Sequence, residues 1–133
     1  MGTLIDTSIL VAIERGQLEP DAALGFGDPE TPGAIAAVTA AELLYGVYRS
    51  SGAQRLATER YCQAWLALFP VIPFDLEVAR VHAMLTHDLR RQGTPIGAHD
   101  LIIAATAVSG GYRVATRDRR SFHRVEGLEL QYW

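Results

Sequence analysis

Short apolar runs alternate with longer segments of helical period along this chain, which is typical of a parallel sheet with crossover helices. Residues 3–5 predict a first strand, and residues 7–14 predict the helix that follows it. Further strands are predicted over residues 34–38, 70–74, 112–116 and 128–131. Further helices are predicted over residues 39–50, 54–68, 75–91 and 98–109. We therefore expect an α/β fold with a mainly parallel central sheet.

Turn-forming residues separate these segments. Residues 16–33 contain four glycines and three prolines, so we expect an irregular connection that is helical only in part. Asp75 is predicted to cap the helix that follows it, and the Gly110-Gly111 pair is predicted to end the helix before it.

The length and composition fit one globular domain spanning residues 1–133. No apolar run approaches the roughly 20 residues that a membrane helix needs. The N-terminus has no basic region and carries an acid at Asp6, so it differs from a secretory signal and we expect a cytoplasmic protein. The single cysteine, Cys62, excludes an internal disulfide, and its apolar neighbours predict a position in the core.

The charged residues change this picture in one respect. All twelve cationic residues are arginines, which excludes every mechanism that requires a lysine. The net charge of −3 does not predict general affinity for nucleic acid, because such affinity comes from cationic side chains. Arg117, Arg119 and Arg120, however, lie in one arginine-rich segment. They either face solvent in a turn or form a rim that contacts phosphates.

Four carboxylates are predicted to meet at one edge of the sheet. Asp6 ends the first strand, and Asp118 follows a late strand. Glu42 and Asp100 are each expected in the first turn of a helix that begins at the same edge. Because ligands of open parallel sheets bind at the carboxyl ends of the strands, the four acids mark a candidate site there.

The chemistry of clustered carboxylates points to a divalent cation. Such groups raise one another's pKa unless a cation compensates their charge. Mg2+ and Mn2+ prefer oxygen ligands and keep several waters, which suits carboxylates that bridge to a substrate phosphate. Such an ion activates a bound water and stabilises a leaving oxygen, so the expected reaction is phosphodiester hydrolysis.

Each acid also has a purely structural explanation. The segment Thr39-Ala-Ala-Glu42 fits a capping box, in which Glu42 takes part in hydrogen bonds at the helix start. Asp6 could cap the helix that follows it, Asp100 could be favoured by a helix dipole, and Asp118 could shape a turn. These explanations leave open why the apolar run after Asp100, Leu-Ile-Ile-Ala-Ala, starts on a polar first turn.

Four segments occur together in the order and spacing of a known family. They are Leu4-Ile5-Asp6-Thr7-Ser8, Thr39-Ala40-Ala41-Glu42-Leu43, residues 97–107 around Asp100, and Thr116-Arg117-Asp118. Together they resemble the PIN-domain family, most closely its VapC-like toxins, along essentially the whole chain. Each motif alone is weak, whereas four in this order are specific.

The resemblance implies a single-domain, Rossmann-like α/β/α sandwich that acts as a Mg2+- or Mn2+-dependent endoribonuclease on an RNA substrate. It also implies a homodimer that a small VapB-like antitoxin neutralises. By position, Asp6 and Asp100 match the principal metal ligands, while Glu42 and Asp118 match the other two catalytic acids.

The resemblance further assigns two hydroxyl positions and shows one departure. Thr7 and Thr116 match residues that orient carboxylates or water, although Thr7 could instead be a helix cap. Many relatives carry a further acid shortly before the phenylalanine of the last motif, where this chain has Ser121 before Phe122. Asp118 alone therefore completes the set of acids here.

Other classes of protein fit the sequence less well. His87-Asp88 and His99-Asp100 are His-Asp pairs, as in HD-type metal phosphohydrolases, but those resemble all-helical bundles and strands are predicted here. His99 itself is expected on the surface at a helix end. Haloacid dehalogenases need an Asp-x-Asp pair where residue 8 is serine, and receiver domains need a lysine. A catalytically silent PIN-like module that binds antitoxin or nucleic acid is the non-enzymatic alternative.

Overall fold

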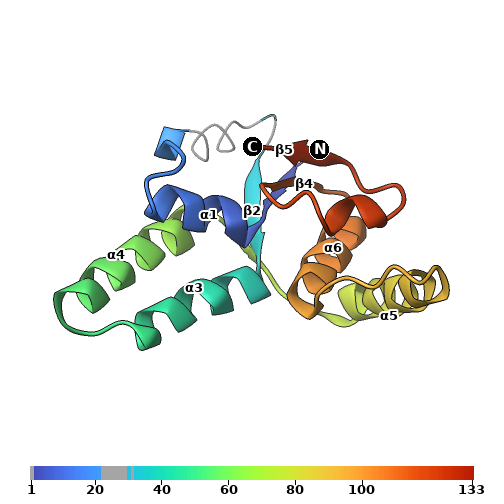
Figure 1. The fold of residues 1–133 in the computed structure, drawn as a ribbon, viewed down its shortest axis with the longest axis horizontal. Helices are drawn as coiled ribbons and strands as arrows, with labels where there is room; N and C mark the ends of the chain where they lie inside the picture. Colours follow the sequence, from blue (N-terminus) through green and yellow to red (C-terminus); the bar gives the residue numbers. More distant parts are fainter. Residues whose placement is uncertain (1, 22–29, 31) are drawn as a thin grey trace.

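The computed structural model describes residues 2–21, 30 and 32–133, and five strands in this part of the chain form one sheet (Figure 1). The strands are β1 (Thr3–Ile5), β2 (Gly33–Ala36), β3 (Val71–Ile72), β4 (Arg113–Thr116) and β5 (Leu130–Tyr132). Their order is β3-β2-β1-β4-β5, and every pairing is parallel. The helices are α1 (Thr7–Glu14), α3 (Ala37–Arg49), α4 (Gly52–Leu68), α5 (Leu76–Arg91), α6 (Ala98–Gly110) and the 3-10 helix η2 (Phe122–Arg124).

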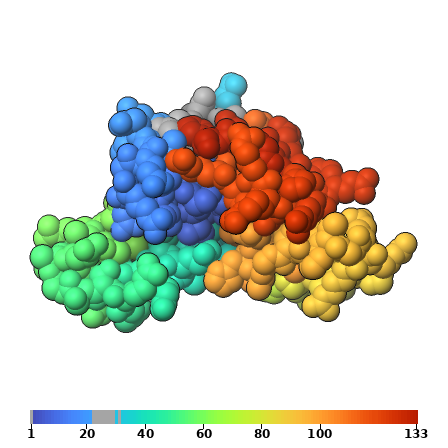
Figure 2. Space-filling model, viewed as in Figure 1, coloured from blue at the N-terminus to red at the C-terminus, as the bar shows by residue number. Residues whose placement is uncertain are grey.

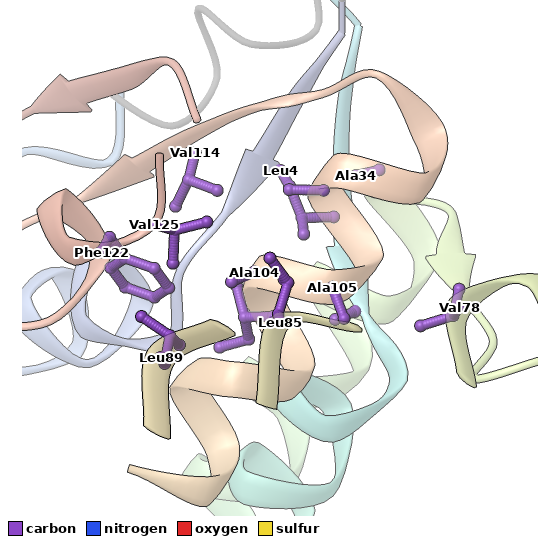
Figure 3. Close-up of a cluster of buried hydrophobic side chains, with 13 residues drawn as sticks. Leu4, Ala34, Val78, Leu85, Leu89, Ala104, Ala105, Val114, Phe122 and Val125 are labelled. Atoms are coloured by element: carbon purple, nitrogen blue, oxygen red, sulfur yellow. The ribbon is translucent and has the colours of Figure 1, made fainter. Parts of the chain in front are cut away.

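Side chains of the strands alternate between two apolar cores, one on each face of the sheet. Leu4 and Val114 belong to the first core, which α5, α6 and Phe122 complete (Figure 3). Ile5 and Ile35 belong to the second core, which α1, α3 and α4 complete. Because consecutive strand residues point to opposite faces, a sheet with helices on both sides requires this pattern. The expected α/β/α sandwich is confirmed, and an all-helical HD-type bundle is excluded.

Cys62 lies in the second core, as its apolar neighbours predict. It is almost fully buried, and its thiol donates a hydrogen bond to the Leu43 carbonyl at 3.2 Å. The thiol therefore joins α4 to α3 and serves as a packing residue.

Most predicted elements are confirmed, and the main differences lie at their ends. The predicted strand over residues 34–38 stops at Ala36, which is the extended N-cap residue of α3. Ala37 and Val38 instead open α3, two residues before the predicted start. Part of the predicted irregular connection, residues 22–29 and 31, lies outside the described residues. The short helix η2 had no sequence prediction.

The predicted ends of α5 and α6 are confirmed by their capping geometry. The Asp75 carboxylate accepts a hydrogen bond from the Val78 amide at 3.0 Å, which satisfies one free donor of the first turn of α5. Gly111 ends α6 in the left-handed conformation, with φ of +70°, which a residue with a side chain rarely adopts.

The strand order brings the carboxyl ends of β1 and β4 side by side. The chain leaves β1 toward β2 on one side, while β4 pairs with the other side of β1. The sheet therefore changes winding direction between β1 and β4, which is where open α/β sheets bind ligands. None of the described helices combines the length and apolar character that crossing a membrane demands.

Candidate active site

Asp6, Glu42, Asp100 and Asp118 all line one open pocket of about 430 Å3. Asp6 directly follows β1, and Asp118 lies two residues after β4. Asp100 lies in the first turn of α6, as predicted, whereas Glu42 lies in the second turn of α3. Because β1 pairs with β4 and α3 contacts α6, four separate segments of the chain bring their carboxylates to this pocket.

Asp6 is the buried acid of the pocket, with 4% of its surface exposed. Its Oδ2 accepts hydrogen bonds from the Ser8 hydroxyl at 2.6 Å and from the Thr116 hydroxyl at 2.7 Å. Within the described residues, Oδ1 takes no hydrogen bond, and the side chain does not cap α1. Asp6 thus occupies the N-cap position of α1, but its carboxylate makes no capping hydrogen bond among these residues.

The two hydroxyls that hold Asp6 also fix the loop after β4. The Ser8 oxygen accepts a hydrogen bond from the Arg117 amide at 3.1 Å. The Thr116 oxygen accepts one from the Asp118 amide at 2.9 Å. Thr116, which was predicted to orient a carboxylate or water, thus orients the Asp6 carboxylate directly. Ser8 has the same role, which was not predicted from the sequence.

The pKa values of two acids reflect mainly their burial and, to a smaller extent, their nearness to the other acids. Burial raises the pKa of Asp6 above its ordinary value; its hydroxyl partners oppose this rise, and the charges of Asp100 and Glu42 add to it. Burial also raises the pKa of Asp100, the Ser121 hydroxyl opposes the rise, and the charges of Asp118 and Glu42 add to it. Ser121, at the position where the family resemblance implies a further acid, therefore favours the ionised form of Asp100.

Glu42 is held by polar contacts across the pocket. Its Oε1 accepts a hydrogen bond from the Thr7 hydroxyl at 2.9 Å, and its Oε2 lies 3.4 Å from Nδ1 of His99. The Thr7 hydroxyl also lies 3.1 Å from Oγ1 of Thr39. Because α3 begins at Ala37, the Thr39–Glu42 pair does not form the predicted capping box. Thr7 instead orients the Glu42 carboxylate, which is the role that the family resemblance implies.

His99 lies at the pocket edge, as a residue of the first turn of α6. Its side chain is 58% exposed, so its predicted surface position at a helix end is confirmed. Its contact with Glu42 was not predicted; the only sequence signal was that it directly precedes Asp100.

Asp118 differs from Asp6 and Asp100 because a cation already faces it. Its Oδ1 accepts hydrogen bonds from the Arg120 amide at 2.8 Å and from Nε of Arg120 at 3.3 Å. The Arg120 side chain is 90% exposed, so this ion pair is weakly held and open to exchange. Asp118 therefore shapes the turn after β4 while it also lines the pocket.

The arginine-rich segment divides between two directions. Arg117 and Arg120 line the acidic pocket, and the Arg117 guanidinium also donates to the Gln17 carbonyl at 3.4 Å. Arg119 instead lies over the Tyr132 ring, with Cζ 4.3 Å from its centre. The structure thus brings two of the three predicted RNA-contacting arginines to the pocket.

The donor set suits a hard divalent cation. Asp6 and Asp100 form no salt bridge within the described residues, and the nearby His99 only partly offsets the charge at Asp100. No three acid, histidine or cysteine side chains in that part of the chain are grouped closely enough to enclose an ion by themselves. Mg2+ and Mn2+ keep several waters and need few protein ligands, so an open pocket of carboxylates fits them.

The model of the PIN-domain family matches residues 3–128. The chain belongs to the PIN-domain family. Ribonuclease VapC1 of Rickettsia felis is 35% identical to this PIN domain over 131 residues, which cover 98% of this chain and 95% of the relative. The tRNA(fMet)-specific endonuclease VapC of Salmonella typhimurium is 32% identical over 102 residues, 74% of each chain.

Solved structures agree with this assignment. A chain in the crystal structure of VapBC2 from Rickettsia felis, bound to a DNA fragment from its promoter, superimposes with a TM-score of 0.90. The match has 25% identity and covers 100% of this chain and 99% of that chain. The resemblance to VapC-like PIN domains that the four motifs suggest is therefore confirmed.

Proposed function

We propose that this PIN domain is a Mg2+- or Mn2+-dependent endoribonuclease. One observation carries the proposal: carboxylates from four segments line one open pocket, and two of them, Asp6 and Asp100, form no salt bridge within the described residues. A divalent cation stabilises such a cluster of carboxylates and can bind a substrate phosphate at the same time. The names of the VapC relatives, a ribonuclease and a tRNA(fMet)-specific endonuclease, support RNA as the substrate class.

Asp6 and Asp100 would hold the ion, and Glu42 and Asp118 would complete its surroundings directly or through water. When bound, the ion supplies an activated water and stabilises the charge that develops on the leaving oxygen.

The chain's own residues supply orientation. Ser8 and Thr116 fix Oδ2 of Asp6, so that Oδ1 is available without a change of rotamer. Thr7 fixes Oε1 of Glu42 by a hydrogen bond. The Glu42 carboxylate can then accept a hydrogen bond from the attacking water and orient the lone pair of that water. This prior orientation lowers the entropic part of the barrier, because the acids need not be ordered during the reaction.

Arg117 and Arg120 would contact substrate phosphates at the rim of the pocket. Arg120 is already placed for this role, since its exposed guanidinium can exchange Asp118 for a phosphate oxygen.

The comparisons also support the biological role. Chains of this fold occur in toxin–antitoxin systems, such as VapBC-5 from Mycobacterium tuberculosis and a toxin–antitoxin complex from Klebsiella pneumoniae. We propose that this PIN domain is the toxin of such a pair, that it acts in the cytoplasm as a homodimer, and that a VapB-like antitoxin neutralises it.

The test is cleavage of structured and unstructured RNA by purified, antitoxin-free protein in Mg2+, Mn2+ or EDTA. We expect cleavage in either metal, none in EDTA, and none by the Asp100→Asn variant, whose fold is checked by circular dichroism. Absence of both cleavage and metal binding would overturn the enzymatic proposal in favour of a silent binding module. Toxicity on expression, relieved by the product of the neighbouring gene, would support the toxin role.

A further inference from the structure

A second cavity adjoins the acidic pocket and lies between α1 and the α3–α4 pair. Its volume is about 310 Å3, and it shares Val11 and Glu42 with the acidic pocket. We call it the α1/α3 groove; residues that line it include Glu14, Arg15, Gly46, Arg49, Ser50 and Gln54. In Figure 2, the blue surface of α1 meets the cyan and green surfaces of α3 and α4, away from the yellow surface of α5.

The groove contains two arginines without a salt bridge to any described residue, although the acids Glu14 and Glu42 also line it. Arg15 and Arg49 are both exposed, and neither forms a salt bridge within the described residues. Most other groove residues are polar, which disfavours an apolar peptide or helix as the occupant. Free guanidinium groups beside a nuclease site suit phosphate oxygens, which they bind with two parallel hydrogen bonds.

An exposed aromatic ring lies beside Arg49, although it is not among the residues that line the groove. Tyr45 is 63% exposed and lies one turn before Arg49 on α3. The guanidinium carbon of Arg49 lies 5.6 Å from the centre of the Tyr45 ring. A tyrosine beside an arginine is the combination on which unpaired nucleobases stack, while their phosphates pair with the cation.

We propose that the α1/α3 groove binds a stretch of single-stranded RNA next to the scissile phosphate, with its phosphates on Arg15 and Arg49 and one base on Tyr45. This inference rests on the proposed ribonuclease function. The two cavities are continuous, because Glu42 lines both of them. An RNA strand in the acidic pocket therefore enters the groove directly past Glu42. The inference also follows from charge, since Arg15 and Arg49 offer phosphate two further cations beyond the two arginines of the acidic pocket.

Glu14 gives the proposal a test of opposite sign. It is an exposed acid in the same groove, outside the acidic pocket. If RNA phosphates lie in the groove, Glu14 repels them, and Glu14→Gln strengthens binding while Arg49→Gln weakens it. General damage to the fold would weaken binding in both variants.

The experiment measures binding of a fluorescent, unstructured RNA of about 16 nucleotides to protein carrying Asp100→Asn, so that the RNA stays intact. We expect the Arg15→Gln/Arg49→Gln double variant to show a weaker salt dependence of RNA binding. The negative slope of log affinity against log salt should become shallower by about 1.4, because each lost phosphate contact contributes about 0.7. Tyr45→Ala should weaken binding about tenfold, and Tyr45→Phe should not, because phenylalanine still stacks. Arg80→Gln with Arg91→Gln on α5 is the matched control for charge, and it should leave the slope unchanged.

The two proposals can fail separately. If wild-type protein cleaves RNA while the groove variants bind and cleave like the α5 control, the groove inference is wrong and the ribonuclease stands. If the groove variants bind RNA normally but lose binding to the antitoxin, the occupant is a protein and the inference is overturned. If the wild-type protein neither binds nor cleaves RNA, both proposals fail.

Discussion

Replacing Thr116 by valine removes the hydroxyl between Asp6 and the loop after β4 while nearly preserving the shape of the side chain. Thr116 is fully buried, donates to Oδ2 of Asp6 at 2.7 Å and accepts from the Asp118 amide at 2.9 Å. Ser8 keeps its own hydrogen bond to Asp6, so the carboxylate loses one of its two donors.

The expected loss follows from the charge of the acceptor. A hydrogen bond to a charged group is worth about 1.5–3 kcal/mol, so the free energy of unfolding should fall by about that amount where Asp6 is ionised. The Thr116 hydroxyl lowers the pKa of Asp6, so its removal raises that pKa further. Because the lost bond stabilised the ionised form, the destabilisation is present above the folded-state pKa of Asp6 and shrinks as pH falls through it.

The assay is urea unfolding of wild type and variant near neutral pH and at mildly acidic pH. Thr106→Val is the matched control, because Thr106 is equally buried and its hydroxyl donates to an uncharged acceptor, the Ile102 carbonyl, at 2.8 Å. We expect the control to cost about 1 kcal/mol or less, without dependence on pH. Equal losses for the two variants at both pH values would refute the argument that Thr116 stabilises a buried charge.

Three further predictions concern the acids of the pocket and the cap of α5. Asp100→Asn should increase the free energy of unfolding near neutral pH, because burial and nearby acids raise the pKa of Asp100; a loss of stability in thermal unfolding would contradict this. Wild-type stability should rise as pH falls through the raised pKa values of Asp6 and Asp100, and the Asp6→Asn/Asp100→Asn double variant should show a flatter pH profile. Asp75→Ala should cost about 1 kcal/mol through loss of the α5 cap while RNA cleavage is unchanged, so a large fall in activity would argue against a purely structural role.

The alternation of apolar and polar residues was enough to predict the layers of this fold. Leu4 and Ile5 follow one another in sequence and enter opposite cores, which is what a strand covered on both faces requires. The start of α3 could not be predicted in the same way. The segment Ala34–Val38 is apolar throughout, and the change from extended to helical backbone at Ala36 leaves no mark in residue type.

For the site as well, features set by neighbouring residues could be predicted from the sequence, whereas contacts between distant segments could not. The positions of Asp6 and Asp118 at strand ends follow from the chain pattern, since a strand and the loop after it are adjacent in sequence. The contacts of Ser8 with the Arg117 amide and of His99 with Glu42 join segments far apart in sequence. Only the pairing of β1 with β4 and the contact of α3 with α6 create them.

Calorimetric titration of Mn2+ into wild-type protein and into the Asp6→Asn and Asp100→Asn variants tests most directly whether the four acids bind one cation, with Asp88→Asn on α5 as a control outside the pocket. If the four acids form one cation site, wild type and the control bind Mn2+ alike, and either pocket variant binds at least about tenfold more weakly. Equal Mn2+ affinity in all four proteins would show that these acids do not act together on a metal ion.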